Sequence, residues 1–411
     1  MLLFTQCHKD KDTTPQPVLT SEQQIMAFMD TIMHNIYYWY DSVPNLDYHN
    51  YTSASDYLEA LRYKKRDRWS FMLTATEANQ IFTQGVDQSY GFMLAIDQSN
   101  NAYVALVYDN SPMYQAGIRR AYRLLKVNNT DVGTLILNNT LGTEVGKSSN
   151  RFLFADTLGN NVDVTVAMAS FNVKTVLYHS IITSGSKKIG YLVLNSFITP
   201  TISELDAAFR EFSQGQVNEF ILDLRYNGGG LVDVAKKLSE YFIPASGNAQ
   251  PAFSFQFNRI YASRYDTTEN FARSSLALNI NRLFVITSSG TASASELVIN
   301  SLRPYMTVKL VGSHTHGKPD GMSEFDKNGY AIFPIIFKLI NANGYGDYFG
   351  GLPVDYQSND GITKQWGNSN EDCLKAAVTY ITTGSYTKSS ILEPQLNYPQ
   401  LSGVRQQLGC Y

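Results

Sequence analysis

The sequence is short of the residues that metal and disulfide chemistry require. Its 411 residues include three cysteines and six histidines. No two cysteines have the C-x-x-C spacing of a zinc site. His314 and His316 flank Thr315, and without a third ligand nearby they do not make a metal site. We therefore expect no metal and no cofactor.

An excess of charge of one sign is also missing. The chain carries 33 basic and 36 acidic side chains, for a formal charge of -3. Phosphate binding needs concentrated positive charge, so nucleic acid is excluded as the main partner. No apolar run reaches eighteen residues, so no membrane-spanning helix is expected. The length predicts two or three domains, and a composition of 44% hydrophobic and 17% charged residues is that of a globular protein.

The first residues form a short apolar stretch that ends at Cys7, followed by a charged and Thr/Pro-rich tract through Pro17. This arrangement resembles the end of a bacterial lipoprotein signal, in which the cysteine is lipidated and a polar tether follows. The resemblance implies a lipid anchor at Cys7, a tether over residues 1–19, and a place in the cell envelope, in the periplasm or on the outer surface. A frayed N-terminus with an incidental cysteine is the alternative.

Residues 20–82 have helical periodicity. Apolar residues recur at the i, i+3, i+4, i+7 spacing between Ile25 and Ile36, and Ser21 with Gln24 three residues later is typical of a capping box. Further helices are expected from about Ser53 and from about Thr74. These residues are predicted to form a small N-terminal helical domain whose role is packing.

Residues 83–170 contain a series of short segments with the pattern of β-strands, which predicts a β domain. Strands are expected at 90–94, 103–107 and 123–128, with a short helix after Pro112. The order resembles a PDZ domain, which implies that a peptide C-terminus binds at the backbone amides of Gly91, Phe92 and Met93. The sequence departs from that pattern at Ala121-Tyr122, where Gly-Asp is usual. A purely structural PDZ-like domain is the alternative.

Residues 171–411 alternate strands and helices. Strands are expected at 188–194, 219–224, 283–287 and 307–311, with helices at 203–212, 232–241 and 295–302. This alternation predicts an α/β layer with a largely parallel sheet. The whole chain is therefore expected to be multidomain α+β.

Three segments of this last region carry chemistry. Strand 219–224 is followed by a turn that contains Gly228, Gly229 and Gly230. Strand 283–287 is followed by a loop of small residues around Ser293, directly ahead of a helix, where free amides and the helix dipole can stabilise an oxyanion. Strand 307–311 is followed by Lys318 between a glycine and a proline. Taken singly, these segments are a tight turn, an ordinary helix N-terminus and a surface lysine.

Together the three segments resemble the signature of the C-terminal processing peptidases, or tail-specific proteases. Residues 223–230 match a DLR.N.GG turn, residues 291–296 match an S-A-S-A-S-E nucleophile loop, and Lys318 matches the lysine of a G-K turn. The resemblance covers residues 90–355 and implies a ClpP/crotonase-like protease core.

The resemblance implies a serine endopeptidase that acts on proteins or peptides. Ser293 corresponds to the nucleophile and Lys318 to the general base, with the amides of Gly229, Gly230 and Ala294 as oxyanion donors. A membrane would be engaged only through the N-terminal lipid.

The third catalytic member is left open, because Met322 stands where the family often has a glutamine that orients the lysine. Asp320 and the Ser295 hydroxyl are the candidates to replace it. Asp223 and Arg225 are expected to brace the glycine turn.

Two other functions fit the same residues. One is a catalytically idle surface protein that binds peptides with this fold, against which the presence of both Ser293 and Lys318 argues. The other is a hydrolase with a triad of Ser293, His316 and Asp223, which sequence order cannot exclude because triads are defined by geometry.

Overall fold

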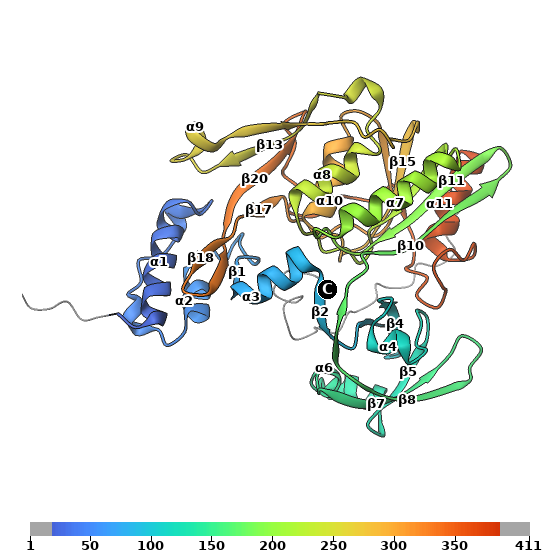
Figure 1. Cartoon of the computed structure of the whole chain (residues 1–411), viewed down its shortest axis with the longest axis horizontal. Coiled ribbons are helices and arrows are strands. Elements are labelled where there is room, and N and C mark those ends of the chain that lie inside the picture. Colours follow the sequence, from blue (N-terminus) through green and yellow to red (C-terminus); the bar gives the residue numbers. More distant parts are fainter. Residues whose placement is uncertain (1–18, 387–411) are drawn as a thin grey trace, which may run out of the picture.

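The computed structural model describes residues 19–386. Cys7 and Cys410 lie outside the described residues. The structure is mixed α and β, with a helical N-terminal region, a β-rich module made by residues 86–172, and an α/β core (Figure 1). Among the described residues, no helix has the length and apolar character needed to cross a membrane.

The N-terminal region packs directly on the core. Its elements are α1 (Ser21–Asn35), η1 (Tyr40–Ser42), η2 (Tyr48–Asn50), α2 (Ala54–Leu61), β1 (Phe71–Thr74), α3 (Ala75–Ala78) and η3 (Asn79–Gln84). The predicted helix starts at Ser53 and Thr74 are confirmed as N-caps. The capping box of α1 lies one residue earlier than predicted, because Thr20 caps the helix and Gln23 closes the box.

The N-terminal region predicted to be helical over 20–82 also contains a strand. Strand β1 pairs antiparallel with β19 (Tyr330–Phe333), which pairs in turn with β18 (Phe325–Lys327). The apolar residues of α1 and α2 form one cluster with Ile332 and Ile335 of the core. Strand β1 of the N-terminal region therefore completes a sheet with strands of the core.

The module of residues 86–172 is built around one antiparallel sheet. Its elements are β2 (Val86–Ser89), β3 (Phe92–Ile96), β4 (Ala102–Val107), α4 (Pro112–Gln115), β5 (Arg123–Val127), β6 (Thr130–Asp131), α5 (Val132–Leu137), α6 (Leu141–Val145), β7 (Ser149–Ala155), β8 (Asn161–Ala167) and β9 (Ala169–Asn172). The strand order is β3-β4-β5-β7-β8, so β3 lies at an edge. Strands β2 and β9 pair as the two chain segments that join the module to the rest.

The core is built on a six-stranded sheet in the order β10-β11-β12-β15-β16-β21. These strands are β10 (Val176–Ser184), β11 (Lys187–Leu194), β12 (Glu219–Asp223), β15 (Arg282–Thr287), β16 (Thr307–Gly312) and β21 (Tyr356–Gln357). All neighbours are parallel except β10 and β11, which confirms the predicted parallel sheet. The helices α7 (Thr201–Gln214), α8 (Val232–Glu240) and α10 (Ala294–Leu302) also lie where they were predicted, within two residues at each end.

Alternate residues of these strands face opposite layers, as the period of two requires. Leu192, Leu222 and Val285 pack in the same cluster as α7, α8 and α10. Tyr191, Ile221 and Ile286 pack with α11 (Asp372–Thr383) on the other face. Burial on both faces explains why these strands read as continuous apolar runs.

A second core sheet has the order β14-β13-β20-β17. Its strands are β13 (Pro251–Phe257), β14 (Thr267–Asn270), β17 (Asp320–Met322) and β20 (Ile335–Asn341), with η4 (Ala245–Gly247) and α9 (Ala262–Tyr265) in the connections. Figure 1 shows β17, β18 and β20 extending from the core toward α1 and α2. Strand β17 of this sheet begins two residues after Lys318, and from there the chain runs toward the N-terminal region.

Candidate active site

Ser293 lies at the junction between β15 and α10. Its backbone has φ 56° and ψ -116°, outside the ordinary range for a residue with a side chain. Such strain costs on the order of 1–3 kcal/mol and persists only where surrounding structure enforces it. Ser293 is partly exposed, whereas Ala292 and Ala294 on either side are buried. The junction thus presents one serine hydroxyl ahead of a helix.

The glycine turn that follows β12 packs against this serine. Gly229 has φ +111°, and a Cβ placed there would lie 2.9 Å from Cβ of Ser293. Gly230 has φ +137°, and its Cβ would lie 2.1 Å from the carbonyl oxygen of Phe197. Both positions therefore require glycine, for conformation and for space.

The predicted oxyanion donors are next to one another but are not equivalent. The amide of Gly229 donates to the side-chain oxygen of Asn227 at 2.9 Å. No described residue accepts the amide of Gly230. Ala294 begins α10, and its nitrogen would lie 3.1 Å from a Cβ on Gly229. The amides of Gly230 and Ala294 are therefore better placed for an oxyanion than that of Gly229.

A buried carboxylate joins the nucleophile loop to the lysine turn. Glu296, 0% exposed in α10, accepts the amide of Ser293 at 2.9 Å and the amide of Lys318 at 2.8 Å on the same oxygen. Its other oxygen accepts the amide of Gly317 at 2.8 Å and the hydroxyl of Thr315. Burial raises the pKa of the Glu296 carboxyl, and the four donors oppose that rise.

Lys318 is 4% exposed and lies under the N-terminal region. Its Nζ is 5.9 Å from the ring centroid of Trp69. The preceding Gly317 has φ +90°, and a Cβ there would lie 2.4 Å from the carbonyl oxygen of Phe349. The lysine is therefore held by a turn that only glycine can make, and buried by a residue from another region.

His316 is held by hydrogen bonds at both ring nitrogens. Its Nδ1 lies 3.2 Å from the carbonyl oxygen of Ser289, and its Nε2 accepts the indole N–H of Trp69 at 3.2 Å. Burial, together with the charges of Arg68 and Lys318, lowers the pKa of His316 to about 4. The imidazole is thus neutral, with Nδ1 protonated and Nε2 occupied, and neither nitrogen is left to take a proton from Ser293.

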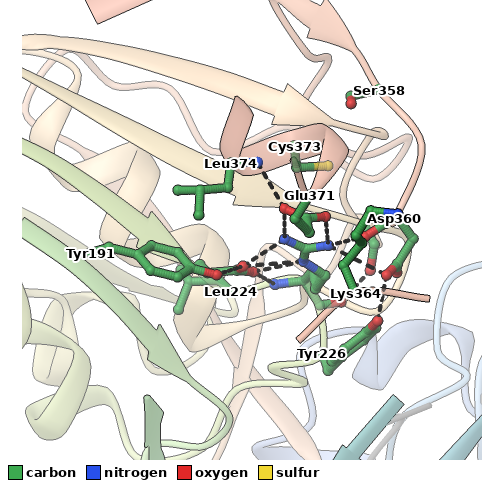
Figure 2. A network of polar contacts seen from close by, with 12 residues as sticks. Tyr191, Leu224, Tyr226, Ser358, Asp360, Lys364, Glu371, Cys373 and Leu374 are labelled. Atoms are coloured by element: carbon green, nitrogen blue, oxygen red, sulfur yellow. Dashed lines mark hydrogen bonds and ion pairs between the residues drawn. The ribbon is translucent and has the colours of Figure 1, made fainter. Parts of the chain in front are cut away.

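Asp223 and Arg225 brace the glycine turn from a buried ionic cluster (Figure 2). The Arg225 guanidinium, 1% exposed, contacts Asp223 and Glu371 at 2.7 Å each. Asp223 also accepts the hydroxyl of Tyr191 at 2.9 Å. The carboxylate of Asp223 is thus engaged by Arg225 and Tyr191. This geometry disfavours a triad of Ser293, His316 and Asp223.

The same cluster reaches the module through Arg120. Its guanidinium donates to the hydroxyl of Tyr226 at 3.0 Å. That hydroxyl donates to Asp360 at 2.6 Å (Figure 2). Arg120 also donates to the carbonyl oxygen of Lys364 at 2.9 Å. Because Tyr226 lies within the turn that leads to Gly229, the module and the glycine turn share one polar network.

The two candidates for the third catalytic member are in different environments. The Ser295 hydroxyl donates to the carbonyl oxygen of Asn227 at 2.9 Å, which commits it to the glycine turn. Asp320 is 1% exposed, and both of its carboxylate oxygens are buried without a hydrogen-bond partner. Met322 packs in an apolar cluster beside Phe71 and Phe333.

The predicted peptide-binding residues lie at the start of β3. Gly91 has φ +76°, and its amide donates to the hydroxyl of Ser89 at 2.9 Å. Phe92 and Met93 begin the edge strand, with Val107 and Leu106 opposite them on β4. Ala121 has φ +70°, which explains why glycine is the usual residue at that position.

Two site residues were missed by the sequence reasoning. Glu296 follows Ser293 by three residues, and this S-x-x-E spacing is a detectable helix-start signal. Trp69 lies 247 residues from His316 in sequence, and no local pattern indicates their contact. The described residues contain no group of three or more His, Cys, Asp or Glu side chains that could hold a metal ion.

Family models match the chain in two places. The model of peptidase family S41 matches residues 188–349, which include the glycine turn, the nucleophile loop and Lys318. The model of the peptidase S41 N-terminal domain matches residues 24–71, which end close to Trp69.

Individual proteins agree with these matches. A candidate CtpA-like serine protease of Staphylococcus aureus is 26% identical over 70% of this chain and 56% of its own length. The crystal structure of a candidate S41 protease from Bacteroides fragilis superposes with a TM-score of 0.73, at 25% identity, over 90% of this chain and all of that one. The photosystem II D1 C-terminal processing protease, at 18% identity, shares the fold with a TM-score of 0.52 over 83% of this chain and 94% of its own.

The family models and the curated relatives that match this chain are those of serine-class peptidases. The chain belongs to peptidase family S41. It spans about half the length of the curated relatives it matches.

We predict that Glu296→Gln lowers both stability and activity. A glutamine keeps one acceptor oxygen and turns an amide N–H₂ toward donors, which leaves buried N–H groups unsatisfied at about 1–3 kcal/mol each. The unfolding free energy, from chemical denaturation, should fall by about 2 kcal/mol or more. Glu240→Gln is the matched control, because Glu240 is a buried helical glutamate whose side chain accepts the amide of Ala272. Equal losses for the two variants would contradict this assignment.

Proposed function

We propose that the chain is a serine endopeptidase with Ser293 as nucleophile and Lys318 as general base. The observation that carries the proposal is the shared acceptor. The amides of both residues donate to one oxygen of Glu296, so the two backbone nitrogens lie within two hydrogen-bond lengths of each other. A nucleophile and a base must be held together in this way.

The reaction would begin when the Ser293 hydroxyl attacks the carbonyl carbon of a peptide bond. Lys318, unprotonated, takes the hydroxyl proton and returns it to the leaving amine. The amides of Gly230 and Ala294 would donate to the oxyanion, where each such donor is worth about 10²–10³ in rate. Water, activated by the same lysine, then releases the acyl group from Ser293.

We predict that Ser293→Ala and Lys318→Ala both abolish cleavage of a fluorogenic peptide while thermal unfolding stays close to that of the wild type. Lys318→Arg should be equally inactive, because arginine keeps its proton throughout the working pH range. Activity should rise with pH as Lys318 loses its proton. Cleavage by Ser293→Ala at the wild-type rate would favour the idle peptide-binding protein and assign the activity to a contaminant.

His316→Gln separates the lysine mechanism from a histidine triad. Glutamine keeps a donor and an acceptor for Ser289 and Trp69, so most activity should remain. A dead His316→Gln beside an active Lys318→Arg would require the triad instead.

We further propose that the module of residues 86–172 is PDZ-like and binds substrate C-termini. Two features support it: β3 is an edge strand to which a peptide can add, and Gly91 precedes it in a left-handed conformation. The network from Arg120 to Tyr226 links this module to the glycine turn. A structural module without ligand is the alternative.

We predict that the wild-type chain cleaves a long substrate with a free C-terminal carboxylate better than the same substrate with an amidated C-terminus. Tethering the tail raises the effective concentration of the scissile bond, so the difference should lie mainly in KM. Short peptides that cannot reach both sites are the control and should show no difference. Indifference of the long substrate to amidation would leave the module a structural role.

We also propose that native protein is held in the cell envelope by lipid on Cys7, which lies outside the described residues. The proposal is based on the apolar stretch that ends in this cysteine and is followed by a polar tract. Intact mass spectrometry of native protein should find a lipid adduct at Cys7. An unmodified chain that begins at Met1 would refute it.

A further inference from the structure

Asp320 is a buried carboxylate beside the lysine turn. It begins β17, two residues after Lys318, and is paired with Lys338 of β20 in the sheet register. The side chain is 1% exposed, and neither carboxylate oxygen has a hydrogen-bond partner. A buried carboxylate without hydrogen bonds is costly and needs a reason to be there.

Charges from three elements face this carboxylate. Lys318 lies on its own segment, Lys338 on β20, and Arg66 and Asp67 on the loop ahead of β1. Burial raises the pKa of Asp320 to about 7, and Lys318 is the neighbouring charge that opposes this rise most. Burial raises the pKa values of the Tyr38 and Tyr348 hydroxyls, and the negative charge of Asp320 adds to both shifts.

Two of the other charges near Asp320, those of Lys338 and Asp67, have partners of their own. Lys338 lies 3.7 Å from Asp347, whose side chain is 75% exposed. Asp67 accepts hydrogen bonds from the Tyr37 hydroxyl at 2.7 Å and from the Trp69 amide at 2.9 Å. Of the charges that face Asp320, Lys318 has the largest effect on its pKa, and it precedes Asp320 by only two residues.

We propose that Asp320 is a positioning residue that supplies the counter-charge when Lys318 takes the proton of Ser293. The inference rests on the proposed function. In the attack step one proton leaves the serine oxygen for the lysine nitrogen, the serine oxygen bonds to the carbonyl carbon, and the carbonyl electron pair moves to its oxygen. No proton moves to Asp320, which stabilises the new ammonium by its negative charge from a buried position.

In this role Asp320 would be the third member of the site, which the sequence alone leaves open. Met322 packs among apolar residues and cannot orient an ammonium, and the Ser295 hydroxyl is committed to Asn227. Of the two candidates, the geometry selects Asp320.

The test is the pH profile of kcat/KM for wild type, Asp320→Asn and Asp320→Ala in the full chain. A nearby negative charge raises the pKa of an ammonium. Removal of the Asp320 charge should therefore move the acid limb of the profile, where kcat/KM rises with pH, down by about one pH unit or more. The plateau should fall about tenfold or more, because the ammonium formed in the reaction loses its counter-charge. Asp347→Asn, which removes an exposed carboxylate beside Lys338, should leave both limb and plateau unchanged.

A stability measurement gives a readout without catalysis. The ordinary pKa of an aspartate is 3.8, so between about pH 4 and about pH 7 the unfolded chain has lost a proton that folded Asp320 keeps. Stability contributed by this group is therefore lost as pH rises through that window. The unfolding free energy of the wild type should fall relative to Asp320→Asn from pH 4 to pH 7, and the difference should level off above it.

The outcomes separate the inference from the function on which it rests. A lower plateau with an unmoved acid limb in both Asp320 variants would mean a merely structural residue and overturn the inference. An unchanged profile, or a flat stability difference between pH 4 and pH 7, would overturn it too. If Asp320→Asn behaves as wild type while Ser293→Ala is dead, this inference alone falls. If the wild type cleaves nothing, both fall.

Discussion

The carboxylate of Glu296 is the group on which the rest of the site depends. It is buried, and four donors from two separate segments converge on its two oxygens. Because hydrogen bonds to an ionised group are about twice as strong as neutral ones, the carboxylate fixes Ser293 and Lys318 in one frame. The strained backbone of Ser293 is tolerated for the same reason, since its amide is one of the four donors.

The core alone does not complete this frame, because the lysine is buried by a residue of the N-terminal region. Trp69 lies over Nζ of Lys318 and holds His316 through its indole N–H. Strand β1 follows directly and pairs with β19, which fixes Trp69 relative to the core. A match of the N-terminal family model to residues 24–71 is thus consistent with a role in the site and not only in packing.

The buried charges around Arg225 and that of Asp320 differ in how they are compensated. The cluster around Arg225 pairs each charge with an opposite one and with hydrogen bonds, so it holds the glycine turn, α11 and the module in one arrangement. Asp320 has no such hydrogen bonds. The fully paired Arg225 cluster is suited to rigid support. The carboxylate of Asp320, which lacks hydrogen bonds, is suited to a change in proton affinity when the charge of its neighbour changes.

Local patterns were enough to predict the parallel strands of the core, α7, α8 and α10, because apolar runs and helix-start signals are properties of neighbouring residues. The glycine turn and the Ser293 loop were predicted for the same reason. Local patterns did not predict the pairing of β1 with β19, the contact of Trp69 with His316, or the choice between Ser295 and Asp320. Each of these depends on groups far apart in the chain. Sequence by itself determined which residues are able to react, whereas only the tertiary structure decided which of them meet, because burial and hydrogen-bond partners exist only once distant segments pack.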